Sequence, residues 1–158
     1  MRRRSRRGRH RRALTGEGVG AEFFTTATGD LLEAATAAGV EHYVALSMVA
    51  ADRVRSGYFR AKAAQENLAR RATVPYSLMR TTPFFESVEA ATAGSRPDGV
   101  HVPPLQLRPV STDDVATMLA HVAASLSLFG VLEEAGPEDL RLEDATAELL
   151  TALGRPAR

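Results

Sequence analysis

The sequence predicts an α/β fold in which a parallel sheet is flanked by helices, and three features of one region predict it. A continuous apolar run, Tyr43 to Leu46, is typical of a strand buried on both faces, and we expect it to be central in its sheet. A helical pattern follows over residues 57–71 and ends at Val74-Pro75. A second apolar run, Tyr76 to Met79, comes next. A strand, a helix and a strand with short connections form a βαβ unit, whose strands are parallel.

The composition describes one ordinary globular domain. The chain has 158 residues, of which 44% are apolar, and this is enough for a hydrophobic core. Cysteine is absent, so there is neither a disulfide framework nor thiolate chemistry, which favours a reducing, cytoplasmic location. No apolar run approaches the roughly 18 residues of a membrane span, so we expect no membrane segment.

Positive charge is concentrated at the start of the chain. Residues 1–12 contain eight arginines, so the remaining residues carry a net charge of −7 although the whole chain carries +1. Like charges repel and nothing apolar is present, so residues 1–13 are expected to form a disordered Arg-rich tail and residues 14–158 the folded part. A phosphate-binding arm for nucleic acid is the alternative, which the lack of interleaved aromatic residues disfavours.

The glycines between Leu14 and Gly20 superficially resemble a phosphate-binding loop. A dinucleotide fingerprint needs an apolar strand directly before G-x-G-x-x-G, whereas arginines precede this segment and its glycine spacing differs. We therefore interpret it as a flexible connector. An apolar stripe predicts a helix from Glu22 to Ala38, and Gly39 is a suitable residue to end it.

The second half of the chain continues the alternation of strands and helices. The expected elements are a short helix to about Ala93, a polar turn at 95–99, two short strand-like pieces within 100–110, a helix from the capping box Ser111–Asp114 to about Ala124, a strand from Phe129 to Glu133, a turn at 135–137 and a last helix from Leu142 to Leu153.

Three residues around the first strand could carry chemistry. Ser47 stands at the end of the strand, and Tyr58 and Lys62 lie four residues apart on one helix face. A tyrosine has a pKa of about 10, which a nearby ammonium lowers towards useful acid/base catalysis. Lys62 could also bind a cofactor ribose, and Ser47 could orient a substrate carbonyl. The alternative is that Tyr58 serves packing only, since Tyr-x-x-x-Lys often arises by chance.

The histidines do not suggest a metal site. His42, His101 and His121 are scattered without the spacing of ligands. Asp113 and Asp114 are most simply helix-capping acids, and Glu86 a solvated helix acid.

Five segments together resemble one family, the NAD(P)-binding short-chain dehydrogenases/reductases, and specifically their atypical NmrA-like branch. The resemblance covers roughly Phe23 to Leu153 and rests on Ala-Ala-Gly-Val-Glu-His-Tyr-Val-Ala-Leu-Ser, Gly-Tyr-Phe-Arg-Ala-Lys, Pro-Tyr-Ser-Leu-Met-Arg-Thr-Thr, Phe84-Phe85-Glu86 and Pro109 to Ala116.

The resemblance implies a Rossmann-like parallel sheet, NAD(P) as the cofactor and Ser47, Tyr58 and Lys62 as the catalytic triad. It also implies that Lys62 and the segment Thr81, Thr82 and Pro83 bind the cofactor, and that Phe84 and Phe85 contact the substrate.

The family's first half, with its Gly-rich βα turn, would precede Phe23, where this sequence departs from the pattern. We therefore expect a partial Rossmann-like sheet, lacking the N-terminal Gly-rich βαβ half, in an N-terminally truncated chain. An exposed sheet edge favours pairing with another chain, such as a homo-oligomer.

The expected function is that of an NAD(P)-dependent oxidoreductase acting on a small carbonyl or quinone substrate, either active or a truncated, inactive copy. The alternative is a non-catalytic dinucleotide-sensing or partner-binding regulatory module.

Overall fold

A computed structural model describes residues 17–55, 57–87, 104–152 and 154 of the chain. Several expectations lie outside these residues: the tail 1–13, the helix end near Ala93 and the turn at 95–99.

The centre of the molecule is a three-stranded parallel sheet. Its strands are β1 (Tyr43–Met48), β2 (Tyr76–Thr81) and β4 (Gly130–Glu134), in the order β1-β2-β4. The α/β prediction is therefore confirmed, but the expected central place of the first strand is wrong, because β2 lies in the middle. Burial of both faces by helices produces an apolar run at any position in a sheet, so the run alone does not reveal which strand is central.

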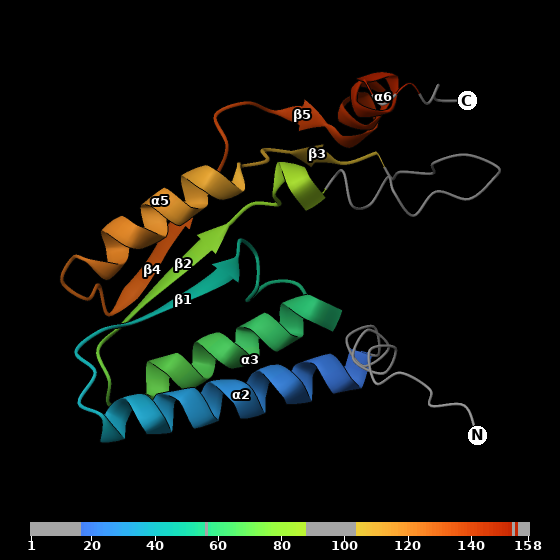
Figure 1. Cartoon of the computed structure of the whole chain (residues 1–158). Coiled ribbons are helices and arrows are strands. Elements are labelled where there is room, and N and C mark those ends of the chain that lie inside the picture. Colours follow the sequence, from blue (N-terminus) through green and yellow to red (C-terminus); the bar gives the residue numbers. More distant parts are fainter. Residues whose placement is uncertain (1–16, 56, 88–103, 153, 155–158) are drawn as a thin grey trace, which may run out of the picture.

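Helices cover both faces of this sheet (Figure 1). The helix α3 (Gly57–Arg71), which joins β1 to β2, lies on one face with α2 (Glu17–Ala37) packed against it, and α5 (Thr112–Ala123) lies on the other face. None of the helices within the described residues is long and apolar enough to cross a membrane.

The first described helix begins earlier than the sequence suggested. α2 starts at Glu17, so residues 17–20 are helical and the interpretation of this part as a flexible connector is wrong. A glycine inside a helix costs only about 1 kcal/mol relative to alanine, which packing of the remaining helix can outweigh.

The end of α2 is as predicted. Gly39 has a φ of 65°, and two backbone hydrogen bonds close the last turn: Val40 N–H to Ala35 O at 2.9 Å and Gly39 N–H to Thr36 O at 3.2 Å. This is the Schellman arrangement, which directs the chain from α2 into β1.

The C-terminal part adds a small unit beside the sheet. The strands β3 (Gln106–Leu107) and β5 (Leu140–Arg141) pair antiparallel, and α6 (Leu142–Ala152) follows directly. As expected, Ser111 caps α5, since its hydroxyl accepts the N–H of Asp114 at 3.1 Å.

The apolar core has one cluster on each side of β2. Leu78 and Met79, neighbours in β2, point to opposite faces and are fully buried. The clusters consist of Ala45, Ala69 and Leu78 under α3, and of Met79, Val110 and Val115 under α5. β2 therefore joins the two layers of helices and fixes where its carboxyl end lies.

Candidate active site

A cavity of about 330 Å³ opens at the carboxyl ends of β1 and β2. In open α/β sheets, this is the edge at which ligands bind. The lining residues are Leu46, Ser47, Met48, Tyr58, Lys62, Thr81, Thr82, Pro83, Phe84 and Ser87.

The cavity thus brings together the three residues expected to be catalytic and most of those expected to bind a ligand. Phe85 is separate. It lines a second cavity, also about 330 Å³, beside α5 with residues such as Asp114, His121 and Glu134. Phe84 and Phe85 therefore face different cavities, although the sequence suggested one shared role.

Tyr58 lies in the first turn of α3 and is half exposed. Burial of the other half raises the pKa of its phenol, opposite to the lowering expected from Lys62. The ammonium of Lys62 lies over the ring of Tyr58, 5.6 Å from its centroid, and interacts with the face of the ring. The phenol of Tyr58 is therefore protonated at neutral pH and is suited to donate a proton.

Lys62 is buried beneath this tyrosine, with 8% of its surface exposed. Its Nζ donates to Leu46 O and to Gln65 Oε1, both at 3.0 Å, and it lies 4.8 Å from the ring centroid of Phe24. Burial lowers its pKa, and the charge of Glu66 partly opposes this. An ammonium has three N–H donors, so two hydrogen bonds leave capacity for one to a ligand.

Ser47 lines the cavity, but its hydroxyl is engaged elsewhere. Its Oγ donates to Glu66 Oε1 at 2.6 Å, and the residue is 2% exposed. In this arrangement, the hydroxyl proton of Ser47 is used in a hydrogen bond to the carboxylate of Glu66 and does not point to a substrate carbonyl.

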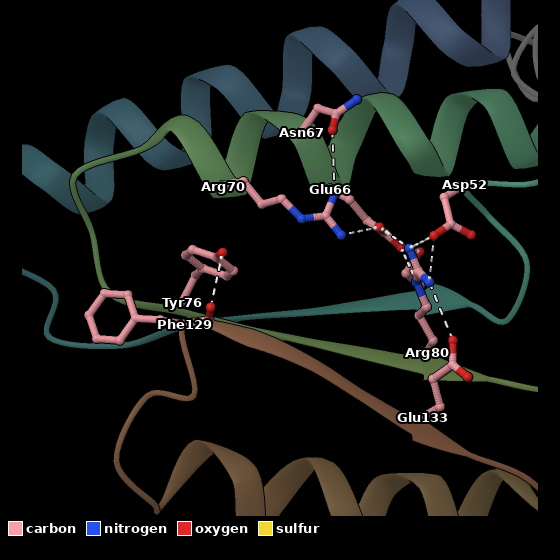
Figure 2. A network of polar contacts seen from close by, with 9 residues as sticks. Asp52, Glu66, Asn67, Arg70, Tyr76, Arg80, Phe129 and Glu133 are labelled. Carbon is pink, nitrogen blue, oxygen red and sulfur yellow. Dashed lines mark hydrogen bonds and ion pairs between the residues drawn. The ribbon is translucent and has the colours of Figure 1, made fainter.

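That carboxylate belongs to an ionic network (Figure 2) whose central pair, Glu66 and Arg80, is buried. Arg80 of β2 binds both oxygens of Glu66, through Nε at 2.9 Å and Nη2 at 2.7 Å, and Arg70 adds a contact at 2.9 Å. Arg80 also reaches Asp52 at 3.2 Å and Glu133 at 3.3 Å. The network joins α3, β2, β4 and the loop after β1.

The network determines the charge state of Glu66. Burial alone would raise the pKa of Glu66, but hydrogen bonds from Arg80, Ser47 and Arg70 outweigh it and hold the pKa below its usual value. The hydrogen bonds that Arg80 donates to Glu66 also raise the pKa of Arg80. Both partners are therefore ionised, as a buried pair requires.

This network was not predicted from the sequence. One signal was present, because Glu66 lies four residues after Lys62 and eight after Tyr58, hence on the same helix face. Nothing local indicated its partner in β2.

The segment after β2 is held from two sides. Thr82 N–H donates to Glu134 O at 3.1 Å, and Thr82 Oγ1 donates to Arg108 O. Val110 N–H donates to Pro83 O at 3.1 Å. These bonds hold in place the segment that the resemblance implies to be cofactor-binding.

No family model matches the chain. A curated relative from Streptomyces griseus, the (4-alkanoyl-5-oxo-2,5-dihydrofuran-3-yl)methyl phosphate reductase, is 32% identical over 131 residues, which cover 79% of this chain and 46% of that protein.

Solved structures share the fold at low sequence identity. The dTDP-glucose 4,6-dehydratase DesIV from Streptomyces venezuelae, solved with NAD bound, aligns with a TM-score of 0.72 at 22% identity, over 91% of this chain and 54% of that chain. The NADPH-dependent quinone oxidoreductase QOR2 from Escherichia coli, complexed with NADPH, aligns with a TM-score of 0.68 at 22% identity, over 82% and 47%. Triphenylmethane reductase from Citrobacter sp., complexed with NADP(H), gives 0.67 at 16%, over 87% and 50%.

These similarities confirm the predicted Rossmann-like fold. This chain spans about half the length of the proteins that it matches.

Proposed function

We propose that this chain carries the nicotinamide and substrate side of an NAD(P)-dependent oxidoreductase of the NmrA-like short-chain dehydrogenase/reductase type, acting on a small carbonyl or quinone compound. The observation that carries the proposal is the cavity at the carboxyl ends of β1 and β2, where Tyr58 and Lys62 meet the segment Thr81–Pro83. The reductase from Streptomyces griseus and the quinone oxidoreductase from Escherichia coli support it by their chemistry.

The described residues fit one end of a dinucleotide. The cavity of about 330 Å³ suits a nicotinamide ring with a small substrate group, and Lys62 retains a donor for a ribose hydroxyl. Within 17–55, 57–87 and 104–152, no Gly-rich turn leads from a strand into a helix, which is the arrangement that a pyrophosphate needs. The fit therefore concerns the nicotinamide and its ribose.

The chemistry assigns different tasks to the two residues on α3. A bound nicotinamide supplies the hydride. Tyr58, whose pKa is raised by burial, holds the proton that passes to the carbonyl oxygen as negative charge develops there. Lys62, fixed by Leu46 O, places positive charge beneath the ring of Tyr58 and beside the ligand.

A second candidate function is dinucleotide sensing without turnover. The observation that favours it is the hydroxyl of Ser47, which donates to Glu66 and so gives no proton to a substrate in this arrangement.

A titration of the purified, monodisperse chain with NADPH and NADH, followed by nucleotide fluorescence, tests the proposal. We expect saturable binding that Lys62→Met weakens about tenfold or more, because a hydrogen bond to a charged group is lost. Arg60→Met is the matched control, since Arg60 lies exposed on the same helix and does not line the cavity, and it should bind like the wild type.

A folded chain that binds neither nucleotide contradicts the proposal. Binding without turnover across a panel of quinones and aldehydes favours the sensing function.

A further inference from the structure

Two hydroxyl groups that line the cavity direct their protons away from it. Ser47 donates to Glu66 Oε1 at 2.6 Å, and Thr82 donates to the backbone carbonyl of Arg108. An ionised carboxylate and a carbonyl oxygen can only accept, so the direction of both hydrogen bonds is fixed.

The surroundings of Glu66 make the orientation of the Ser47 proton persistent. Glu66 is 1% exposed, and the two guanidinium groups of Arg80 and Arg70 keep its carboxylate charged. A hydrogen bond to a charged acceptor belongs to the stronger class, and turning the Ser47 proton into the cavity would remove a donor from a buried anion.

Four of the polar side chains that line the cavity therefore divide into two kinds, and Thr81 and Ser87 line it as well. Tyr58 and Lys62 offer donors, while Ser47 and Thr82 offer only lone pairs. A ligand carbonyl is complementary to Tyr58 and Lys62, and it has nothing to offer to the oxygen of Ser47.

We infer that the ligand group that meets Ser47 is a hydrogen-bond donor, such as a carboxamide N–H or a hydroxyl, and that Glu66 is the positioning residue that imposes this polarity. The inference rests on the proposed function, in which Tyr58 donates its proton to a carbonyl oxygen and Lys62 lies beside the ligand. It departs from the expectation that Ser47 orients that carbonyl.

Benzamide and acetophenone form a suitable probe pair, because both carry a carbonyl and only the amide adds an N–H donor in place of a methyl group. We measure the dissociation constants of both by NMR chemical-shift titration of the full chain. The quantity compared is the ratio of the acetophenone to the benzamide constant. We expect this ratio to be about fivefold larger in the wild type than in Ser47→Ala, which corresponds to one ordinary hydrogen bond.

Two further variants separate polarity from a general structural effect. Ser47→Thr keeps the hydroxyl and should keep the wild-type ratio. In Glu66→Gln, the new side-chain amide can donate an N–H to Ser47, which frees the serine proton to point into the cavity. The ratio of the acetophenone to the benzamide constant should then fall to that of Ser47→Ala, although the serine is present. Ser47→Ala leaves the Glu66–Arg80 pair in place, so the inference is testable even where Glu66→Gln does not fold.

Equal ratios in the wild type and Ser47→Ala overturn the inference, and so does a chain that binds neither probe up to the limit of solubility. The titration uses no dinucleotide. Failure of the proposed function would appear as absent nucleotide binding or turnover, whereas this inference fails through the probe titration alone.

Discussion

At the scale of single residues, Tyr58 and Lys62 differ in burial although they share one face of α3. Tyr58 is 51% exposed, whereas Lys62 is 8% exposed. The lysine is fixed by Leu46 O and Gln65 Oε1, while the tyrosine retains access to a ligand. This difference suits a proton donor that contacts substrate and a cation that holds the surrounding site in place.

Tyr58→Phe tests the role of the phenol. We expect turnover to fall by about 10²- to 10⁴-fold, because a general acid is lost, while nucleotide binding stays within about twofold. Steady-state kinetics and the fluorescence titration measure the two effects. Tyr76→Phe is the control, since it removes a phenol that donates to Phe129 O at the opposite end of β2. Unchanged turnover in Tyr58→Phe would exclude the assigned role.

Glu66→Ala tests the buried network. It leaves Arg80, whose side chain is 7% exposed, without its buried partner, and breaking a buried pair in this way costs about 3–5 kcal/mol of folding free energy. Glu133→Ala removes a half-exposed partner of the same arginine, and should cost at most about 1 kcal/mol. Urea unfolding of both variants measures the difference. Similar losses of unfolding free energy would show that the stabilisation by each partner of Arg80 does not depend on how deeply that partner is buried.

At the scale of elements, the sequence predicted what local patterns determine. The apolar runs at 43–46 and 76–79 became β1 and β2, each two residues longer than expected, and the boundaries of α3 agree with the prediction. The start of α2 did not follow from composition, because glycines at 18 and 20 suggest a connector unless the packing of the whole helix is known. The division between Phe84 and Phe85 depends on the position of α5, which is distant in sequence.

Two glycines of the α2 region should respond oppositely to alanine. Gly29 lies inside α2 and an added Cβ would meet nothing within 4 Å, so Gly29→Ala should stabilise the protein by about 0.5–1 kcal/mol through helix propensity. Gly39 has a positive φ, so Gly39→Ala should destabilise it by about 1 kcal/mol or more. Thermal unfolding of both variants tests this, and a stabilising Gly39→Ala would contradict the assigned end of α2.

At the scale of the whole molecule, a network of residues far apart in sequence joins the sheet and its helices. Ser47, Glu66 and Arg80 come from three successive elements, and Glu133 comes from β4, after a long intervening segment. The βαβ pattern predicted that these elements are neighbours. It could not predict which polar side chains pair between them, because that depends on register, with Ser47 opposite Arg80 and Arg80 opposite Glu133.

The network makes the stability of the molecule sensitive to acid. The pKa of Glu66 lies below its ordinary value of 4.5 in the folded protein. The contribution of ionised Glu66 to the free energy of unfolding is therefore complete above about pH 4.5. It is lost as the pH falls through the lowered pKa that Glu66 has in the folded protein. We expect the melting temperature of the wild type to fall more steeply below pH 4.5 than that of Glu66→Ala. Parallel pH profiles for the two proteins would contradict this.

Lys62 is the sole lysine among the 158 residues, and its ammonium lies in the candidate site. Because burial lowers its pKa, more of this amine is in the neutral, nucleophilic form at a given pH than for an exposed lysine. Apart from the terminal amine, a small amine-directed reagent has one lysine to modify. Labelling of Lys62 therefore reports whether the cavity is accessible. The mass increase of the product then shows whether Lys62 is modified in addition to the terminal amine, and a ligand that fills the cavity slows the labelling of Lys62.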